Sequence, residues 1–164
     1  MMRCWTRLYL WCRELCRNNR DHVGRCAPLT QPRPEDTIMS TNPAPGFTRQ
    51  PDRRMHYAPT SSRVRVILNS VLVADSTNAI MLQEEDFPPV YYLPQVDVRM
   101  DLARRTGRST HCPFKGNASY WTVTVGDKVA KNTIWAYETP FDEAMAVRNL
   151  VAFYANKVDV IQVG

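Results

Sequence analysis

From Arg63 to the C-terminus, the sequence is a series of short segments in which apolar and polar residues alternate, separated by turn residues. In the first segment, valines alternate with arginines up to Leu68, and Asn69-Ser70 then forms a turn into a second arm over residues 71–74. Further strands are expected at residues 78–82, 90–93, 96–102, 110–112, 119–125, 128–130, 133–137 and 158–163. One helix is expected between Asp142 and Tyr154. This pattern predicts a mainly β domain built of two antiparallel sheets, with a single helix in its C-terminal region.

Charge changes at the same boundary. Residues 1–62 contain ten arginines, no lysine and five acidic residues, which accounts for the whole net charge of +5. Residues 63–164 contain eleven basic and eleven acidic residues and are neutral. The sequence therefore predicts two regions, a basic tail at 1–62 and a domain at 63–164. A neutral domain lacks the electrostatic attraction to phosphate backbones that nucleic-acid binding requires.

The tail is expected to be disordered from residue 27 onward, because it is rich in proline and poor in aliphatic residues. Residues 1–20 have an arginine-rich amphipathic pattern, which has two interpretations. It is either a mitochondrial targeting segment, or an untranslated extension upstream of a true start at Met39. The first interpretation predicts a mitochondrial protein and the second a cytoplasmic one.

No metal or other cofactor is expected in the domain. Cys112 is the only cysteine after residue 62, and the four tail cysteines lack the paired spacing of a zinc module. No apolar run is long enough to cross a bilayer, so no membrane association is expected.

Two groups of residues are candidates for ligand binding. The first is aromatic and comprises Tyr92, Trp121, Trp135 and Tyr137, which form either the core or the wall of a pocket. The second is the polar face of the strand expected at 96–102, where Arg99 lies between Asp97 and Asp101. There Arg99 is either part of a surface ion-pair ladder or an anchor for an anionic ligand.

The pair His111-Cys112 and the turn residue Lys115 are further candidates. Neighbours on a strand point to opposite faces, so His111 and Cys112 are not expected to act as a dyad. His111 is either a general base or a structural ring, and Cys112 either a catalytic candidate or a small buried residue. Lys115 is either a phosphate contact or a solvated charge. Asp101 completes the catalytic candidates, although no reaction follows from these residues.

Several segments together carry a resemblance to a known family. They are Arg63-Val64-Arg65-Val66, Pro88-Pro89-Val90-Tyr91-Tyr92-Leu93-Pro94, Asp97-Val98-Arg99-Met100-Asp101-Leu102, Ser109-Thr110-His111-Cys112-Pro113-Phe114-Lys115-Gly116, Ala118-Ser119-Tyr120-Trp121 and Ile134-Trp135-Ala136-Tyr137. The chain resembles domain-of-unknown-function family 427, some of whose members carry a nucleotidyltransferase label. The resemblance implies a β-tent-like fold, in which two antiparallel sheets meet at an angle with a pocket between them.

These observations support three hypotheses about function. The first is a domain that binds a small, anionic molecule in an aromatic pocket between the sheets, with or without catalysis. The second is a non-catalytic interaction module for a peptide or a modified side chain. The third is nucleotidyl transfer, which is disfavoured because Asp97 and Asp101 would be roughly 13 Å apart on a strand. The oligomeric state does not follow from the sequence.

Overall fold

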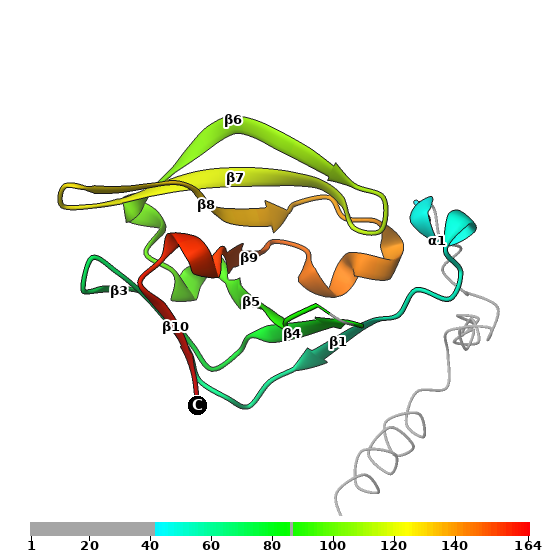
Figure 1. The fold of residues 1–164 in the computed structure, drawn as a ribbon, viewed down its shortest axis with the longest axis horizontal. Coiled ribbons are helices and arrows are strands. Elements are labelled where there is room, and N and C mark those ends of the chain that lie inside the picture. The colour runs from blue at the N-terminus through cyan, green and yellow to red at the C-terminus, as the bar shows by residue number, and fades with distance from the viewer. Residues whose placement is uncertain (1–41, 86) are drawn as a thin grey trace, which may run out of the picture. The chain divides into compact units, whose positions relative to one another are not determined.

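A computed structural model describes residues 42–85 and 87–164, which form two antiparallel sheets (Figure 1). The strands are β1 (Met55–Pro59), β2 (Val64–Leu68), β3 (Val71–Ser76), β4 (Ile80–Glu84), β5 (Val90–Pro94), β6 (Ala103–Cys112), β7 (Gly116–Val125), β8 (Lys128–Tyr137), β9 (Leu150–Phe153) and β10 (Val160–Val163). One sheet has seven strands in the order β1-β4-β5-β9-β8-β7-β6, and the other has three in the order β10-β2-β3. The predicted mainly β, two-sheet fold is confirmed.

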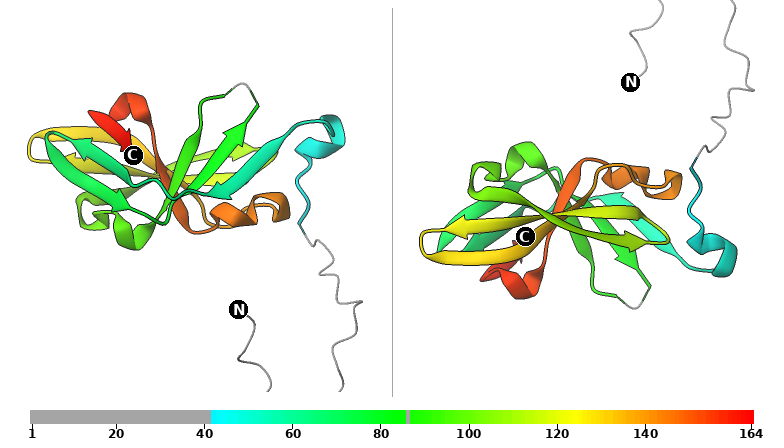
Figure 2. Two further views of the ribbon diagram at one scale, coloured as in Figure 1. Left: turned by 90° about the horizontal axis from the view of Figure 1, so that it is seen from below. Right: turned by 90° about the horizontal axis from the view of Figure 1, so that it is seen from above.

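Turn chemistry explains the β2–β3 hairpin. Asn69 and Ser70 have φ values of 50° and 61°, the left-handed conformation that a tight two-residue hairpin turn requires. The turn between β7 and β8 likewise contains Gly126 at a φ of 59°. Figure 2 shows these two turns at one end of the molecule and the short helix α1 (Gly46–Arg49) at the other.

The strands β6, β7 and β8 are longer than the sequence predicts. Residues 104–108 lie between the strands expected at 96–102 and 110–112, but they belong to β6, which continues through an irregularity between Arg105 and Ser109. The two strands expected at 128–130 and 133–137 are one strand, β8, in which Asn132 has a φ of 49°. Bulges of this kind let a strand bend without ending.

The strand expected at residues 96–102 is absent. Two short 3₁₀ turns, Gln95–Asp97 and Met100–Leu102, occupy this segment. A strand would place Val96 and Val98 on the same face, but Val96 is 92% exposed whereas Val98 is 8% exposed and packs into the core. Asp97, Arg99 and Asp101 therefore do not share a strand face.

The helix expected between Asp142 and Tyr154 is shorter than the sequence predicts. Only Asp142–Val147 is helical, as a 3₁₀ segment, and Leu150–Phe153 forms the central strand β9 instead. Asn149, at a φ of 60°, breaks the helical path between them. Of the apolar residues that suggested a helix, Leu150 and Val151 lie in β9, Tyr154 follows it, and Met145 is exposed.

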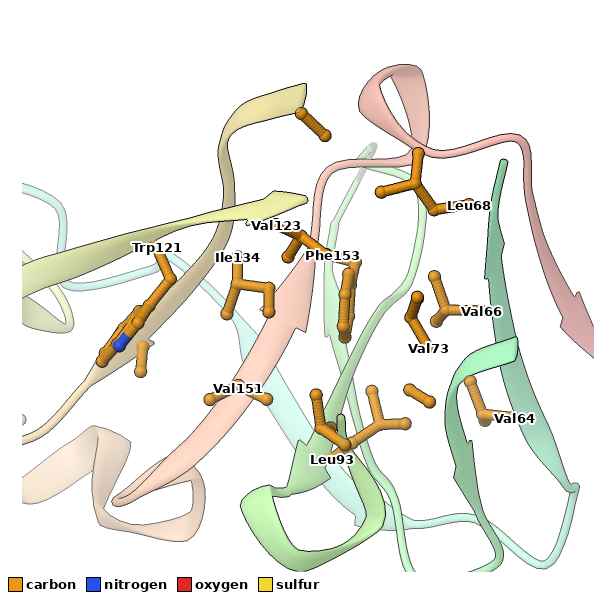
Figure 3. Close-up of a cluster of buried hydrophobic side chains, with 14 of the residues drawn as sticks. Val64, Val66, Leu68, Val73, Leu93, Trp121, Val123, Ile134, Val151 and Phe153 are labelled. Atoms are coloured by element: carbon orange, nitrogen blue, oxygen red, sulfur yellow. The ribbon is translucent and has the colours of Figure 1, made fainter. Parts of the chain in front are cut away.

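Apolar side chains form two clusters. In the larger one, Val64, Val66 and Leu68 of β2 face Val123, Ile134 and Phe153 of the large sheet, as Figure 3 shows. The second cluster combines residues of the large sheet with two of the 3₁₀ segment Asp142–Val147: Leu82, Tyr92, Ala118, Tyr120, Tyr137 and Ala152 from the sheet, and Ala144 and Val147 from the 3₁₀ segment. The strands of the large sheet thus contribute side chains to these clusters, which explains the apolar residues in their sequences.

The fold extends upstream of Arg63, where the charge change placed the boundary. Strand β1 pairs with β4 along its whole length, from Met55 opposite Glu84 to Pro59 opposite Ile80. Farther upstream, the Gly46 amide donates to the Pro113 carbonyl at 2.9 Å. The disorder predicted from residue 27 to residue 62 is therefore wrong for residues 42–62, which contain α1 and β1. The remainder of that prediction, the targeting segment and the tail cysteines lie outside the described residues.

Candidate functional site

A cavity of about 430 Å³ lies between the two sheets. Its lining combines residues of both sheets and of the loops beside them: Arg53, Val64, Val66, Leu82, Glu84, Phe87, Pro88, Pro89, Val90, Tyr91, Leu93, Trp135, Phe153, Tyr154, Ala155 and Ile161. Most of these side chains are apolar or aromatic. Arg53 and Glu84 are the charged members of the described lining.

The cavity opens where β5 and β9 part. These neighbouring strands pair only at Leu93 with Val151 and at Pro94 with Leu150. If the antiparallel ladder continued, Tyr91 would lie opposite Phe153 and Val90 opposite Tyr154. All four of these residues line the cavity instead. The site therefore occupies a gap in the sheet that the backbone itself creates.

Aromatic rings form one wall. Trp135 of β8 contacts Tyr154, with ring centroids 4.3 Å apart, and Tyr92 packs edge-on behind Trp135 at 6.3 Å. Tyr120 stacks on Tyr154 from the side of β7. Burial and the hydrogen bond with Tyr120 raise the pKa of Tyr154 to about 12. The wall is thus neutral at physiological pH, with flat surfaces on which a planar ligand can pack.

A group of charged side chains, partly withdrawn from solvent, lies at one end of the cavity. Glu84 accepts a hydrogen bond from Arg53 at 3.0 Å through Oε2, and its Oε1 accepts one from Lys115. Lys115 is only 7% exposed. Burial by itself raises the pKa of Glu84, but the hydrogen bonds and charges of Lys115 and Arg53 outweigh it and hold that pKa below its ordinary value. Glu84 is therefore ionised and shared between two cations.

Two buried polar atoms near this end have no partner among the described residues. They are Nε of Arg53 and the hydroxyl of Tyr57. The Arg53 guanidinium lies over the ring of Phe114 at 4.7 Å and over that of Phe87 at 5.7 Å. Burial raises the pKa of Tyr57, so its hydroxyl stays protonated. Buried donors without acceptors are uncommon in folded proteins and suggest a site for a further group.

The structure brings some of the predicted ligand-binding residues to this cavity. Trp135 lines it, and Tyr92 lies directly behind Trp135. Lys115 was expected to be either a phosphate contact or a solvated charge, but it is buried against Glu84. Tyr137 is buried in the second cluster and does not line the cavity.

Trp121 and the Arg99 group lie elsewhere. Trp121 packs in the larger cluster beneath Arg105, whose guanidinium is 5.4 Å from its ring. Arg99 forms a two-point ion pair with Asp101, at 2.8 and 2.7 Å, in which both side chains are more than half exposed. Asp97 instead accepts a hydrogen bond from Ser76 at 2.6 Å. Arg99 is thus paired at the surface, away from the aromatic wall.

His111 and Cys112 have separate surroundings, as their adjacent positions on a strand predict. His111 Nδ1 is 2.8 Å from Oδ1 of Asn117, and its ring packs edge-on against Phe141. His111 also lines a second cavity of about 380 Å³ next to α1. Cys112 packs against the tyrosine cluster. Neither residue lines the cavity between the sheets.

Sequence reasoning missed the charged end of the cavity. Arg53 was assigned to the tail, and Glu84 belongs to a run of acidic residues that resembles a solvated loop. Tyr154 was assigned to a helix stripe. No local pattern could have connected Glu84 with Lys115, because they are 31 residues apart in the sequence.

Two further observations concern the described part of the chain. It contains no group of three or more His, Cys, Asp or Glu side chains arranged to hold a metal ion. None of its helices has the length and apolar character needed to span a bilayer.

Comparison with known proteins identifies the family. No match to the chain is found among curated proteins. A family model described as a domain of unknown function, DUF427, matches residues 56–164, which include β1 through β10 apart from the first residue of β1. This match covers well over half of the chain and agrees with the resemblance in the sequence. The chain therefore belongs to the DUF427 family.

Proposed function

We propose that this domain binds a small organic molecule with a flat apolar body and an anionic group, in the cavity between the two sheets. The observation that carries the proposal is the cavity itself. Its volume of about 430 Å³ falls within the range of small-molecule sites, and its lining is mainly apolar with a few polar groups at one end.

The arrangement of the lining gives the ligand an orientation. The apolar body packs on the wall formed by Trp135 and Tyr154, and the anionic group faces Arg53 at the charged end. Arg53 replaces Arg99 in this role, because Arg99 is paired with Asp101 outside the cavity.

The interactions of the carboxylate side chains argue against nucleotidyl transfer and leave ligand binding as the favoured function. Transfer of a nucleotide depends on metal ions held by clustered carboxylates. Asp97 and Asp101 are engaged with Ser76 and Arg99, and Glu84 is held by two cations. Within residues 42–85 and 87–164, no specific contact favours the interaction module.

A screen of small carboxylic acids and their neutral analogues tests the proposal. The full-length chain is melted with each compound, and ligands are expected to raise the melting temperature. Binding should weaken in Trp135→Phe but not in Trp121→Phe, because Trp121 is equally a sheet tryptophan but lies outside the cavity. Equal binding by both variants, or no stabilising compound at all, would contradict the proposal.

A further inference from the structure

We infer that the ligand of the cavity is a monocarboxylate, that Arg53 binds its carboxylate, and that Lys115 keeps Arg53 free to do so. This inference rests on the proposed function and goes beyond it by naming the ligand class and a positioning residue. Three features of the charged end carry the argument.

The first feature is that the two carboxylate oxygens of Glu84 accept hydrogen bonds from different residues. An arginine and a carboxylate normally pair through two parallel hydrogen bonds, one to each oxygen. Here Arg53 Nη2 reaches only Oε2, at 3.0 Å, because Oε1 accepts from Lys115. Lys115 therefore prevents the two-point pair from closing.

The second feature is a hydrogen-bond donor of Arg53 that remains without a partner because Glu84 also pairs with Lys115. Nε of Arg53 is buried and has no acceptor among residues 42–85 and 87–164. A buried N–H without an acceptor costs about 1–3 kcal/mol, and a ligand oxygen that accepted from Nε would recover this cost. Arg53 lines the cavity, and its guanidinium carbon lies 4.7 Å from the ring centroid of Phe114 and 5.7 Å from that of Phe87. A carboxylate is a planar acceptor that suits this planar donor.

The third feature is the charge balance. Arg53 and Lys115 carry one positive charge each, and Glu84 carries one negative charge, which leaves one positive charge in excess. A single carboxylate neutralises this excess. A dianion would leave a negative charge unpaired beside apolar residues, and a neutral ligand would leave the positive charge unpaired. The site therefore favours a ligand with one negative charge.

Three probes of the same aromatic body distinguish these cases: naphthoate, naphthamide and naphthalene dicarboxylate. Dissociation constants are measured by calorimetry with the full-length chain. We expect naphthoate to bind roughly tenfold to a hundredfold more tightly than naphthamide, the effect of one hydrogen bond to a charged group. The dicarboxylate should also bind more weakly than naphthoate.

Variants then test the named residues. Arg53→Gln should bind naphthoate and naphthamide equally, and Arg53→Lys should lose most of the preference because lysine has no Nε–H in that place. Arg99→Gln is the matched control and should keep the preference, since Arg99 lies outside the cavity.

Lys115→Met tests the positioning role. Without Lys115, Glu84 can offer both oxygens to Arg53, so the preference for naphthoate should fall although Arg53 is intact. A merely structural role would weaken both probes by the same factor and leave their ratio unchanged. Thermal melts of each variant confirm that it is folded before binding is compared.

The outcomes separate the inference from the proposed function. If naphthoate and naphthamide bind wild type equally, the cavity binds ligands but the carboxylate assignment is wrong. If Arg53→Gln keeps the preference for naphthoate, Arg53 is not the anchor. If none of the three probes binds, both the inference and the proposed function fail.

Discussion

Glu84 has a stabilising role that is separate from any ligand. A carboxylate buried in an apolar setting is costly unless it is paired, and Glu84 is paired with both Arg53 and Lys115. Each of the two cations pairs with one oxygen of Glu84, which neutralises one of their two positive charges. The three residues come from the segment before β1, the end of β4 and the β6–β7 turn, so this single carboxylate links three parts of the chain.

Replacement of Glu84 by Gln should change how stability depends on pH. The pKa of Glu84 in the fold lies below its ordinary value of 4.5, so the fold favours the ionised form. This contribution is present above the ordinary value and is lost as the pH falls through the lower pKa of the folded state. Denaturant unfolding should therefore show Glu84→Gln less stable than wild type at pH 7, with the difference shrinking below about pH 4.5. If the stability difference between wild type and Glu84→Gln stays constant with pH, the pairing of ionised Glu84 with Arg53 and Lys115 is contradicted.

The ion pair of Arg99, unlike that of Glu84, is expected to contribute little to stability. Its ion pair with Asp101 is exposed to solvent, and such pairs contribute little because the charges are screened and the side chains lose freedom. We expect Arg99→Lys to leave the melting temperature and the response to carboxylate probes unchanged. The measurement is a thermal shift of both proteins against the same compounds. A selective loss of ligand response would restore Arg99 as an anion site.

At the level of elements, α1 is held against the β6–β7 turn by close contact. The amide of Gly46 donates to the Pro113 carbonyl, and the ring of Phe47 packs edge-on against Phe114 at 5.1 Å. Gly46 allows this approach because a side chain there has no room. A Cβ atom would lie 2.6 Å from the ring of Phe114 and 2.8 Å from the Pro113 oxygen.

Gly46→Ala should therefore destabilise the protein. Overpacking of this kind costs about 1–3 kcal/mol. Gly107→Ala is the matched control, because a Cβ atom at Gly107 meets nothing within 4 Å. That control should change the free energy of unfolding by less than about 0.5 kcal/mol. Denaturant titrations measure both, and equal values for the two variants would show that α1 is not packed as described.

The elements that the sequence predicts correctly are those whose signals are local. The β2–β3 hairpin follows from its Asn69-Ser70 turn and its alternating valines, and the strand at Val90–Pro94 follows from its flanking prolines. Residues 96–102 have the same alternation, but they turn because their contacts are distant: the Arg99 amide bonds the Val73 carbonyl at 2.8 Å. Alternation alone cannot reveal such a contact.

The candidate site was predictable in part for the same reason. Trp135 and Tyr92 were identifiable because aromatic residues in strands favour cores and pockets. The group of Arg53, Glu84 and Lys115 was not, since its members are brought together by the pairing of β1 with β4 and by the β6–β7 turn. A site built from separate strands of a sheet requires the strand order, which the sequence pattern does not contain.

At the scale of the whole molecule, the cavity exists because one sheet takes part in two cores. The strands from β9 to β6 pack against the three-stranded sheet on one side, whereas β1, β4 and β5 form the tyrosine-lined cluster with them on the other. The strand β5 joins these halves, and it pairs with β9 through only two residues, Leu93 and Pro94. The strand β4, which Figure 1 shows below β5, lines the cavity through Leu82 and Glu84. Because β1 pairs with β4 along its whole length, the cavity depends on both strands.

This dependence predicts that residues 42–62 belong to the folded unit. Two truncated chains, 42–164 and 63–164, differ only in α1, β1 and their connections, so their comparison isolates that segment. Removal of β1 exposes the edge of β4, the packing surface of Met55 and Tyr57, and Glu84 without Arg53. Burial of those two side chains alone is worth at least about 2 kcal/mol, so the shorter chain should melt at a lower temperature and less cooperatively. It should also lose the preference for carboxylate probes. Identical melting of the two chains would instead place the boundary at Arg63, as the charge change suggests, and would make β1 an accessory strand.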